Sequence, residues 1–293
     1  MFRGVGTALV TPFRSDGSLD ESALARFIDW QIDEGVNFLV PCGTTGENPA
    51  LGADEHRRVV EIAVQRAKGR VPVLAGAGNN NTARAVEMAE QAIDLGADGI
   101  LTITPYYNKP TPDGLLRHFG AQAEALEKKK SGFPMVLYNV PGRTSLNMTA
   151  ETTLRMAAEI PNVCGVKEAS GNMEQILTIL RDRPEGFLVI SGDDAWTLPL
   201  LFMGGDGVIS VASNEVPRLM RQMVDRRDVD IHNRLLPLLT GNFIESSPIP
   251  VKTALKMMGI LESDTVRPPL APITDANRTK LEAILRECGL LPS

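Results

Sequence analysis

Short apolar runs alternate with stretches of helical periodicity along most of this chain, and that alternation is the feature that most restricts its fold. Several of the runs are apolar at every position, which is typical of a parallel sheet covered by helices on both faces. Eight runs are predicted to be strands: residues 5–10, 37–40, 71–75, 99–103, 135–139, 163–166, 187–190 and 207–211. Five stretches between them are predicted to be helices: residues 20–35, 54–68, 82–95, 149–159 and 172–183.

Eight strands separated by helices favour a single α/β unit, a (β/α)8 TIM barrel, which we expect to span residues 1–225. A doubly wound open sheet is the structural alternative. Four further helical patterns end the chain, at residues 217–224, 228–239, 249–258 and 275–288. We interpret the first as the eighth barrel helix and the others as a C-terminal helical extension over residues 226–293.

Charge and cysteine content argue against several classes of partner. The net charge of −6 and the pI of about 5.3 disfavour nucleic acid and anionic membranes as partners. No apolar run approaches the roughly 18–20 residues of a membrane span, and the N-terminus has no signal-peptide profile. Cys42, Cys164 and Cys288 are too widely spaced for a disulfide framework, so we expect a cytoplasmic protein. The histidines are scattered, and no metal site is expected.

Lys167 is the most informative single residue, because it follows a run that should be buried on both faces. With a period of two it is expected to share a face with Gly165 and Val163. Lysine is rarely buried without a partner. We interpret Lys167 as a desolvated amine of lowered pKa that attacks a carbonyl group. The alternative is a structural ion pair with Glu168 or Asp193 just beyond the strand.

Other strand ends carry groups that suit the same chemistry, since a barrel places its active site at the carboxyl ends of its strands. Tyr138 is a candidate proton donor and acceptor, or else a core tyrosine. Residues 43–46 (GTTG) form either a carboxylate-binding nest of backbone N–H groups or a plain turn. Arg143 either binds a carboxylate with two hydrogen bonds or is a surface cation.

Two further segments have weaker signals. Asp193 and Asp194 are interpreted as a strand-end turn that orients Gly192, in preference to a metal site. His56 lies in a charged segment and is expected on a solvated helix face, with a regulatory contact as the alternative.

Six motifs stand out along the chain: 43–47 (GTTGE), 104–108 (TPYYN), 138–144 (YNVPGRT), 165–169 (GVKEA), 191–194 (SGDD) and 248–252 (PIPVK). In type and order they resemble the dihydrodipicolinate synthases, also called 4-hydroxy-tetrahydrodipicolinate synthases, and the resemblance runs from Gly4 to about Leu291. That family belongs to the pyruvate-dependent class I aldolase superfamily, which includes N-acetylneuraminate lyase.

The resemblance implies roles for individual residues. Lys167 would form a Schiff base with pyruvate, Thr45 would bind the pyruvate carboxylate, and Ile209 would contact pyruvate through its backbone. Tyr138 would shuttle protons. With Thr44 it would form a relay completed by Tyr107, which would reach into the neighbouring subunit.

The resemblance also implies the second substrate and the assembly. Arg143 would orient the carboxylate of L-aspartate-4-semialdehyde, with Gly192 among the substrate-binding residues. No cofactor would be needed, because the lysine imine itself draws electrons, and a homotetramer built as a dimer of dimers is expected. A lyase acting on sugar acids or sialic acid is the nearest alternative, and a barrel that binds keto acids without turnover is a second.

Feedback inhibition by L-lysine is expected to be weak. The chain matches the lysine-regulated members of the family at His56, Asn80 and Tyr106. At three other positions the regulated members have small polar Ser, His and Glu, whereas this chain has Asn48, Ala53 and Arg84. An arginine in place of a glutamate reverses the charge that would face the ammonium groups of lysine.

Overall fold

The computed structural model describes residues 1–292 and contains one eight-stranded parallel sheet. The strands are β1 (Gly4–Ala8), β2 (Phe38–Val40), β3 (Leu74–Gly76), β4 (Gly99–Ile103), β5 (Met135–Asn139), β6 (Val163–Glu168), β7 (Leu188–Ser191) and β8 (Gly207–Ser210). Their order in the sheet is β2-β1-β8-β7-β6-β5-β4-β3. The two ends of that order meet, because Leu39 on β2 bridges Val73 and donates to the carbonyl oxygen of Pro72 at 2.9 Å. The sheet is therefore a closed barrel, which confirms the predicted fold over the open-sheet alternative.

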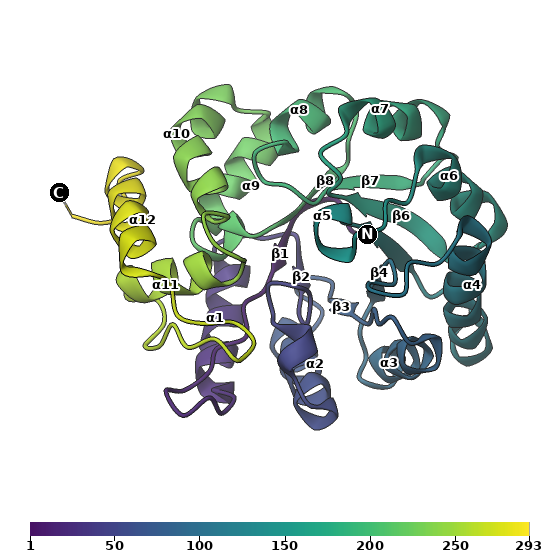
Figure 1. The fold of residues 1–293 in the computed structure, drawn as a ribbon, viewed down its shortest axis with the longest axis horizontal. Coiled ribbons are helices and arrows are strands. Elements are labelled where there is room, and N and C mark those ends of the chain that lie inside the picture. Colours follow the sequence, from purple (N-terminus) through teal and green to yellow (C-terminus); the bar gives the residue numbers. More distant parts are fainter. Residues whose placement is uncertain (293) are drawn as a thin grey trace.

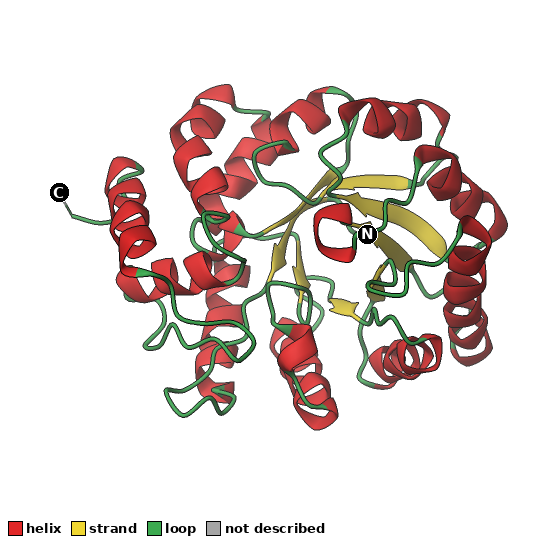
Figure 2. Ribbon diagram, viewed as in Figure 1, coloured by secondary structure: helices red, strands yellow, loops and turns green. Residues whose placement is uncertain are grey.

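Helices surround the strands, as Figures 1 and 2 show. They are α1 (Glu21–Asp33), α2 (Ala53–Ala67), α3 (Thr82–Asp94), α4 (Pro112–Lys129), α6 (Ala150–Glu159), α7 (Met173–Asp182), α8 (Thr197–Phe202) and α9 (Pro217–Arg226). The short helix α5 (Pro141–Thr144) lies over the barrel (Figure 1), and two 3₁₀ turns, η1 (Asn48–Ala50) and η2 (Ala212–Asn214), follow β2 and β8.

Side-chain caps explain where several helices begin. The side chains of Asp20, Asn81 and Asn172 accept hydrogen bonds from the backbone N–H three residues later, at the starts of α1, α3 and α7. Such caps satisfy N–H groups that have no partner within the helix. The five helices predicted between the strands are confirmed. The helices α4 and α8, however, were not predicted.

The barrel interior is a separate apolar core, and its amino-terminal end is filled by aromatic rings. Phe2 and Phe38 are fully buried, with ring centres 5.6 Å apart. A Cβ atom on Gly6 would lie 2.1 Å from the Phe38 ring, so only glycine fits at this point of β1. Because this end is packed, the space for a substrate lies at the carboxyl ends of the strands.

An irregularity in β6 corrects one detail of the predicted faces. Met135 pairs with Val163, but the next residue, Val136, pairs with Gly165, so Cys164 is an extra residue in β6. Such a bulge changes which side chains face each way. Gly165 and Lys167 share a face as expected. Val163 does not, since it packs in the outer core between strands and helices.

Three helices follow the barrel: α10 (Val229–Gly241), α11 (Ile249–Met257) and α12 (Asp275–Glu287). They lie outside the ring of barrel helices, on the left in Figure 1. Their apolar side chains form a core with α9, in which Met220, Leu235, Leu281 and Leu285 are fully buried. The proposed division between residues 225 and 226 falls in the last turn of α9.

Candidate active site

Lys167 lies at the carboxyl end of β6, opposite Tyr138 of β5 in the strand register. Its side chain is buried, and its Nζ atom is 4.3 Å from the centre of the Tyr138 ring. Within residues 1–292 it forms no ion pair, so the predicted alternative is wrong. Glu168 faces the other side of the strand, where its carboxylate accepts hydrogen bonds from Asn139 and from the N–H of Ser170.

The surroundings of Lys167 favour a neutral amine. Burial lowers the pKa of Lys167 to about 7, the charge of Asp194 opposes that shift, and the Arg143 guanidinium adds to it. An ordinary lysine is protonated at neutral pH and cannot attack a carbonyl. At pH 7 a large fraction of Lys167 is therefore a nucleophile.

Tyr138 is also buried, and burial raises the pKa of its hydroxyl. The positive charge of Arg143 and the nearby Thr44 side chain act against that rise. Burial is the larger effect and keeps the hydroxyl protonated, near Thr44 and on the ring that faces the Lys167 amine. This arrangement suits the transfer of protons to and from a group bound on Lys167.

The loop between β2 and η1 has the form of an anion-binding nest. Its ends, Cys42 and Glu47, both adopt left-handed backbone conformations, with φ of 57° and 55°. The N–H of Gly46 donates to Gly43, and that of Glu47 to Thr44. In the part of the chain described, the N–H groups of Thr44 and Thr45 donate to no other residue. Two unused N–H groups in one turn are the donors that a carboxylate requires.

A cavity of about 440 Å³ opens beside these residues. Thr44, Tyr138, Arg143 and Thr144 line one part of it. Arg143 is exposed on α5. The Pro-Gly-Arg-Thr segment, expected as a turn, is one short turn of helix that lies over the barrel (Figure 1). Lys167 does not line this cavity. Tyr138 lines it, and the Lys167 amine lies against the Tyr138 ring.

The ends of β7 and β8 complete the surroundings of the lysine. A Cβ atom on Gly192 would lie 3.1 Å from Cε of Lys167 and 2.7 Å from the side chain of Ala169, so glycine lets the end of β7 come close. Ile209 is fully buried on β8 and faces the barrel interior. Asp194 accepts hydrogen bonds from the N–H groups of Val211 and Ala212 at 3.0 and 2.9 Å, and so joins the ends of β7 and β8.

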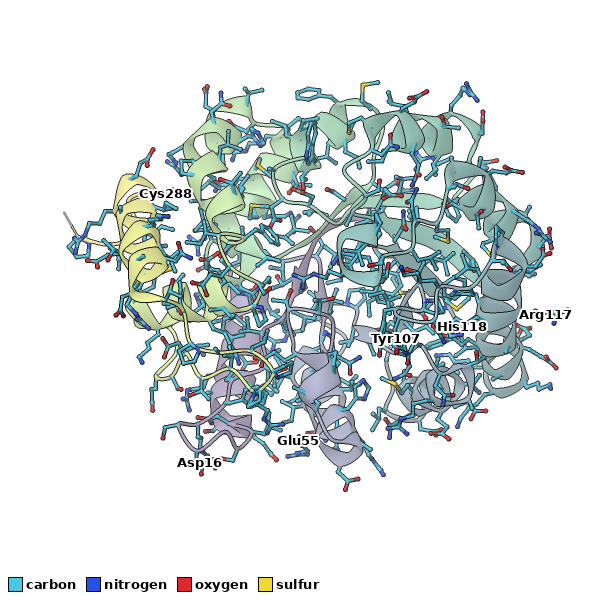
Figure 3. The ribbon with its side chains drawn as sticks, in the orientation of Figure 1. Asp16, Glu55, Tyr107, Arg117, His118 and Cys288 are labelled. Carbon is cyan, nitrogen blue, oxygen red and sulfur yellow. The ribbon has the colours of Figure 1, made fainter. Side chains whose placement is uncertain are left out.

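The structure does not bring Tyr107 to this site within one chain. Tyr107 is 90% exposed, with a φ of 71°, on the segment between β4 and α4 (Figure 3). Asn108 donates to the carbonyl oxygen of Asn80 at 2.9 Å, and Asn80 donates to that of Tyr106 at 3.2 Å, which ties this segment to the loop after β3. One chain thus brings Lys167, Tyr138 and Thr44 to the site, but not Tyr107.

His56 corrects another expectation, because it is buried rather than solvated. Its Nε2 atom lies 2.8 Å from the carbonyl oxygen of Gly76. The charged neighbours of His56 in the sequence concealed the pattern: His56, Val59, Val60 and Ala63 have the three- and four-residue spacings of the buried stripe of α2. His56 also lines the cavity, together with Arg84.

Two interactions near the site were not predicted. One is the charge of Asp194, which acts on the Lys167 amine although the sequence indicated only a turn at that point. The other is a buried ion pair between Glu47 and Lys252, 2.5 Å apart. Both residues stand inside recognised motifs, but nothing in their spacing along the chain indicates that they meet.

A closed (β/α)8 barrel with a buried lysine, a buried tyrosine and a polar cavity at the carboxyl ends of its strands defines a barrel enzyme. Comparison with known proteins then identifies the family. The model of the dihydrodipicolinate synthetase family matches residues 1–288, and the chain belongs to that family. It is a lyase of the 4-hydroxy-tetrahydrodipicolinate synthase type.

Individual relatives match this chain over nearly their whole length. The 4-hydroxy-tetrahydrodipicolinate synthase of Koribacter versatilis is 50% identical over 99% of this chain and 97% of its own. The crystal structure of dihydrodipicolinate synthase from Thermotoga maritima is 41% identical, with a TM-score of 0.94 over 99% of this chain and 100% of that one. The chloride-inhibited enzyme from Acinetobacter baumannii, solved in complex with pyruvate, is 38% identical with a TM-score of 0.95 over the same shares.

Proposed function

We propose that this enzyme condenses pyruvate with L-aspartate-4-semialdehyde to give 4-hydroxy-tetrahydrodipicolinate, a step of diaminopimelate and lysine biosynthesis. The observation that carries the proposal is the buried Lys167 amine, with its pKa lowered to about 7, beside the Tyr138 ring. A relative of known structure was solved with pyruvate, the keto acid whose carbonyl such an amine would attack.

Pyruvate would bind with its carboxylate on the nest. The unused N–H groups of Thr44 and Thr45 would donate to the carboxylate, together with the Thr45 hydroxyl. The ketone carbon would then face Lys167, and the backbone of Ile209 would limit the pocket from β8. A side chain at position 192 would crowd Lys167 and Ala169, so the glycine would keep the amine accessible to a small keto acid.

The lysine would then activate pyruvate as a nucleophile. The neutral amine adds to the ketone, and loss of water gives a protonated imine. This cation draws electrons, so the methyl group loses a proton and becomes an enamine. Each of these steps moves a proton, and the hydroxyls of Tyr138 and Thr44 would carry it.

The second substrate would enter from the cavity side. The enamine carbon forms a bond with the aldehyde carbon of L-aspartate-4-semialdehyde, whose carboxylate would pair with Arg143 over the cavity. The amine of that substrate then displaces Lys167 from the imine, which closes the ring and releases the enzyme. The lysine supplies the electron sink, so no cofactor enters this scheme.

The exposed Tyr107 supports a shared active site. An aromatic ring that is 90% exposed on a left-handed backbone is costly unless it packs on another surface. We propose that Tyr107 enters the site of a neighbouring copy and completes its relay, in a homotetramer built as a dimer of dimers.

No described helix is long and apolar enough to cross a bilayer.

A substrate comparison tests the proposal. The purified enzyme is supplied with pyruvate and L-aspartate-4-semialdehyde, and heterocycle formation is followed by absorbance after oxidation. Sialic acid and 2-keto-3-deoxy sugar acids are tested in the cleavage direction in parallel. Condensation at least a hundredfold faster than any cleavage supports the proposal, and faster release of pyruvate from a sugar acid would replace it with the alternative.

A further inference from the structure

A buried ion pair outside the catalytic set joins the C-terminal extension to the loop after β2. Nζ of Lys252, on α11, lies 2.5 Å from Oε1 of Glu47, and the two side chains are 0% and 1% exposed. Lys252 also donates to the carbonyl oxygen of Thr265 at 2.8 Å and lies 4.1 Å from the centre of the Phe13 ring. Buried ion pairs add little net stability compared with apolar side chains of the same size, and their best-attested use is to select one conformation.

Glu47 is well placed to transmit such a selection to the nest. Its N–H donates to the carbonyl oxygen of Thr44 at 3.0 Å, so a shift of Glu47 displaces the turn that carries Thr44 and Thr45. Its left-handed backbone, like that of Cys42 at the other end of the loop, is disfavoured for a residue with a side chain. The loop therefore needs contacts from outside to keep its shape.

Those contacts come from the extension. Within residues 1–292, the two hydrogen bonds to the Glu47 carboxylate come from Lys252 and from the N–H of Arg267, the latter at 2.9 Å. Arg267 is itself held by Glu55 at the start of α2, with both Oε atoms 2.6 Å from its guanidinium. Figure 3 marks Glu55 on that helix. The segment around Arg267 thus bridges α11, the loop and α2.

The pair also removes an electrostatic obstacle. The Glu47 carboxylate lies two residues beyond Thr45, and without a partner its charge would repel an anion on the nest. Burial lowers the pKa of Lys252 to about 8 against the opposing effect of Glu47, so Lys252 remains largely protonated at neutral pH. The ammonium group then balances the carboxylate.

We propose that Lys252 is a positioning residue for pyruvate: through Glu47, the C-terminal extension holds the 43–48 loop in the conformation that binds the substrate carboxylate. The proposal rests on the proposed function, since it assigns the loop to pyruvate. It gives α11 and the segment around Arg267, both outside the barrel, a part in shaping the active site.

The test uses three variants: Lys252→Met, Glu47→Gln and the double variant that combines them. Each is compared with the control variant Lys256→Met. Lys256 is a matched control, because it stands on the same helix, pairs with Asp264 at 2.7 Å and is partly exposed. Three quantities are measured: the pyruvate concentration that half-saturates borohydride trapping on Lys167, amide hydrogen exchange of residues 43–48, and the melting temperature. The trapping assay reports pyruvate binding without the second substrate.

The single variants should raise the half-saturating pyruvate concentration about tenfold, equivalent to about 1.4 kcal/mol, with faster loop exchange and an unchanged trapping plateau. The double variant leaves no unpaired buried charge, so it should regain melting temperature. It should nevertheless keep the weakened pyruvate binding and the faster exchange, because the link to α11 is gone. Lys256→Met should match the wild type in all three.

Recovery of wild-type pyruvate binding and loop exchange in the double variant would overturn the proposal and leave the pair a purely structural one. Should a single variant fail to fold, the double variant decides the question. Should the wild type itself show no trapping by pyruvate, the proposed function fails. The positioning claim is then still tested, because unchanged loop exchange in the double variant would refute it.

Discussion

Replacing Lys167 by Met should make the enzyme inactive and, at neutral pH, more stable. Burial lowers the pKa of Lys167 from 10.5 to about 7. Between these values the unfolded chain binds more protons than the folded chain, so wild-type stability rises with pH across this window. The penalty for desolvating the amine is complete below pH 7 and absent above pH 10.5. It amounts to about 4 kcal/mol at pH 7 and about 2 kcal/mol at pH 9.

Methionine has a similar length and no charge to desolvate, so Lys167→Met should escape this penalty at every pH. Urea unfolding of both proteins at pH 7, 8 and 9 measures the difference in free energy of unfolding. We expect a gap in favour of the variant that shrinks by about half from pH 7 to pH 9. Lys256→Met, at a partly exposed lysine, is the control and should show no such trend. A variant less stable than the wild type, or a gap independent of pH, would refute the account of a desolvated lysine.

Three other predictions concern assembly, metals and regulation. Tyr107→Phe should lower turnover without loss of fold, and mixing it with Lys167→Ala subunits should restore part of the activity, since each defect would lie in a different site; no recovery on subunit exchange would argue against a shared site. Activity should survive EDTA, because the chemistry needs only the lysine amine, and activity lost to EDTA and restored by a divalent ion would point to another mechanism. L-Lysine should inhibit weakly, because Arg84 lines the cavity and its positive charge would repel the ammonium groups of lysine. Steady-state assays over micromolar to tens of millimolar lysine check this, Arg84→Glu should strengthen any inhibition, and strong sub-millimolar inhibition of the wild type would contradict it.

Much of the fold could be predicted from the sequence, because local pattern and tertiary role agree there. The runs at β4 and β5 were predicted to the residue, since buried parallel strands are apolar throughout and glycine or proline marks their ends. Helix α4 was missed although Leu115, Phe119 and Leu126 have helical spacing, because Gly114 and Gly120 weaken the local helical preference. The bulge at Cys164 was beyond prediction, since it depends on the register with β5.

The candidate site shows the same division. The position of Lys167 at the end of a buried strand follows from its sequence context, and the structure places it there beside Tyr138. Contacts between distant segments cannot be predicted from residue spacing: Glu47 and Lys252 form an ion pair although they are 205 residues apart in the sequence. His56 was misplaced because its charged neighbours outweighed its spacing to the buried valines of α2.

The central claim is that Lys167 forms a covalent imine with pyruvate. Borohydride reduction in the presence of pyruvate, followed by digestion and mass spectrometry, tests it most directly. We predict one added reduced pyruvate per chain, located on the peptide that contains Lys167, and no addition in Lys167→Ala, whose turnover should fall by orders of magnitude. Addition on another lysine, or a Lys167→Ala variant that keeps more than a few per cent of wild-type turnover, would contradict the claim.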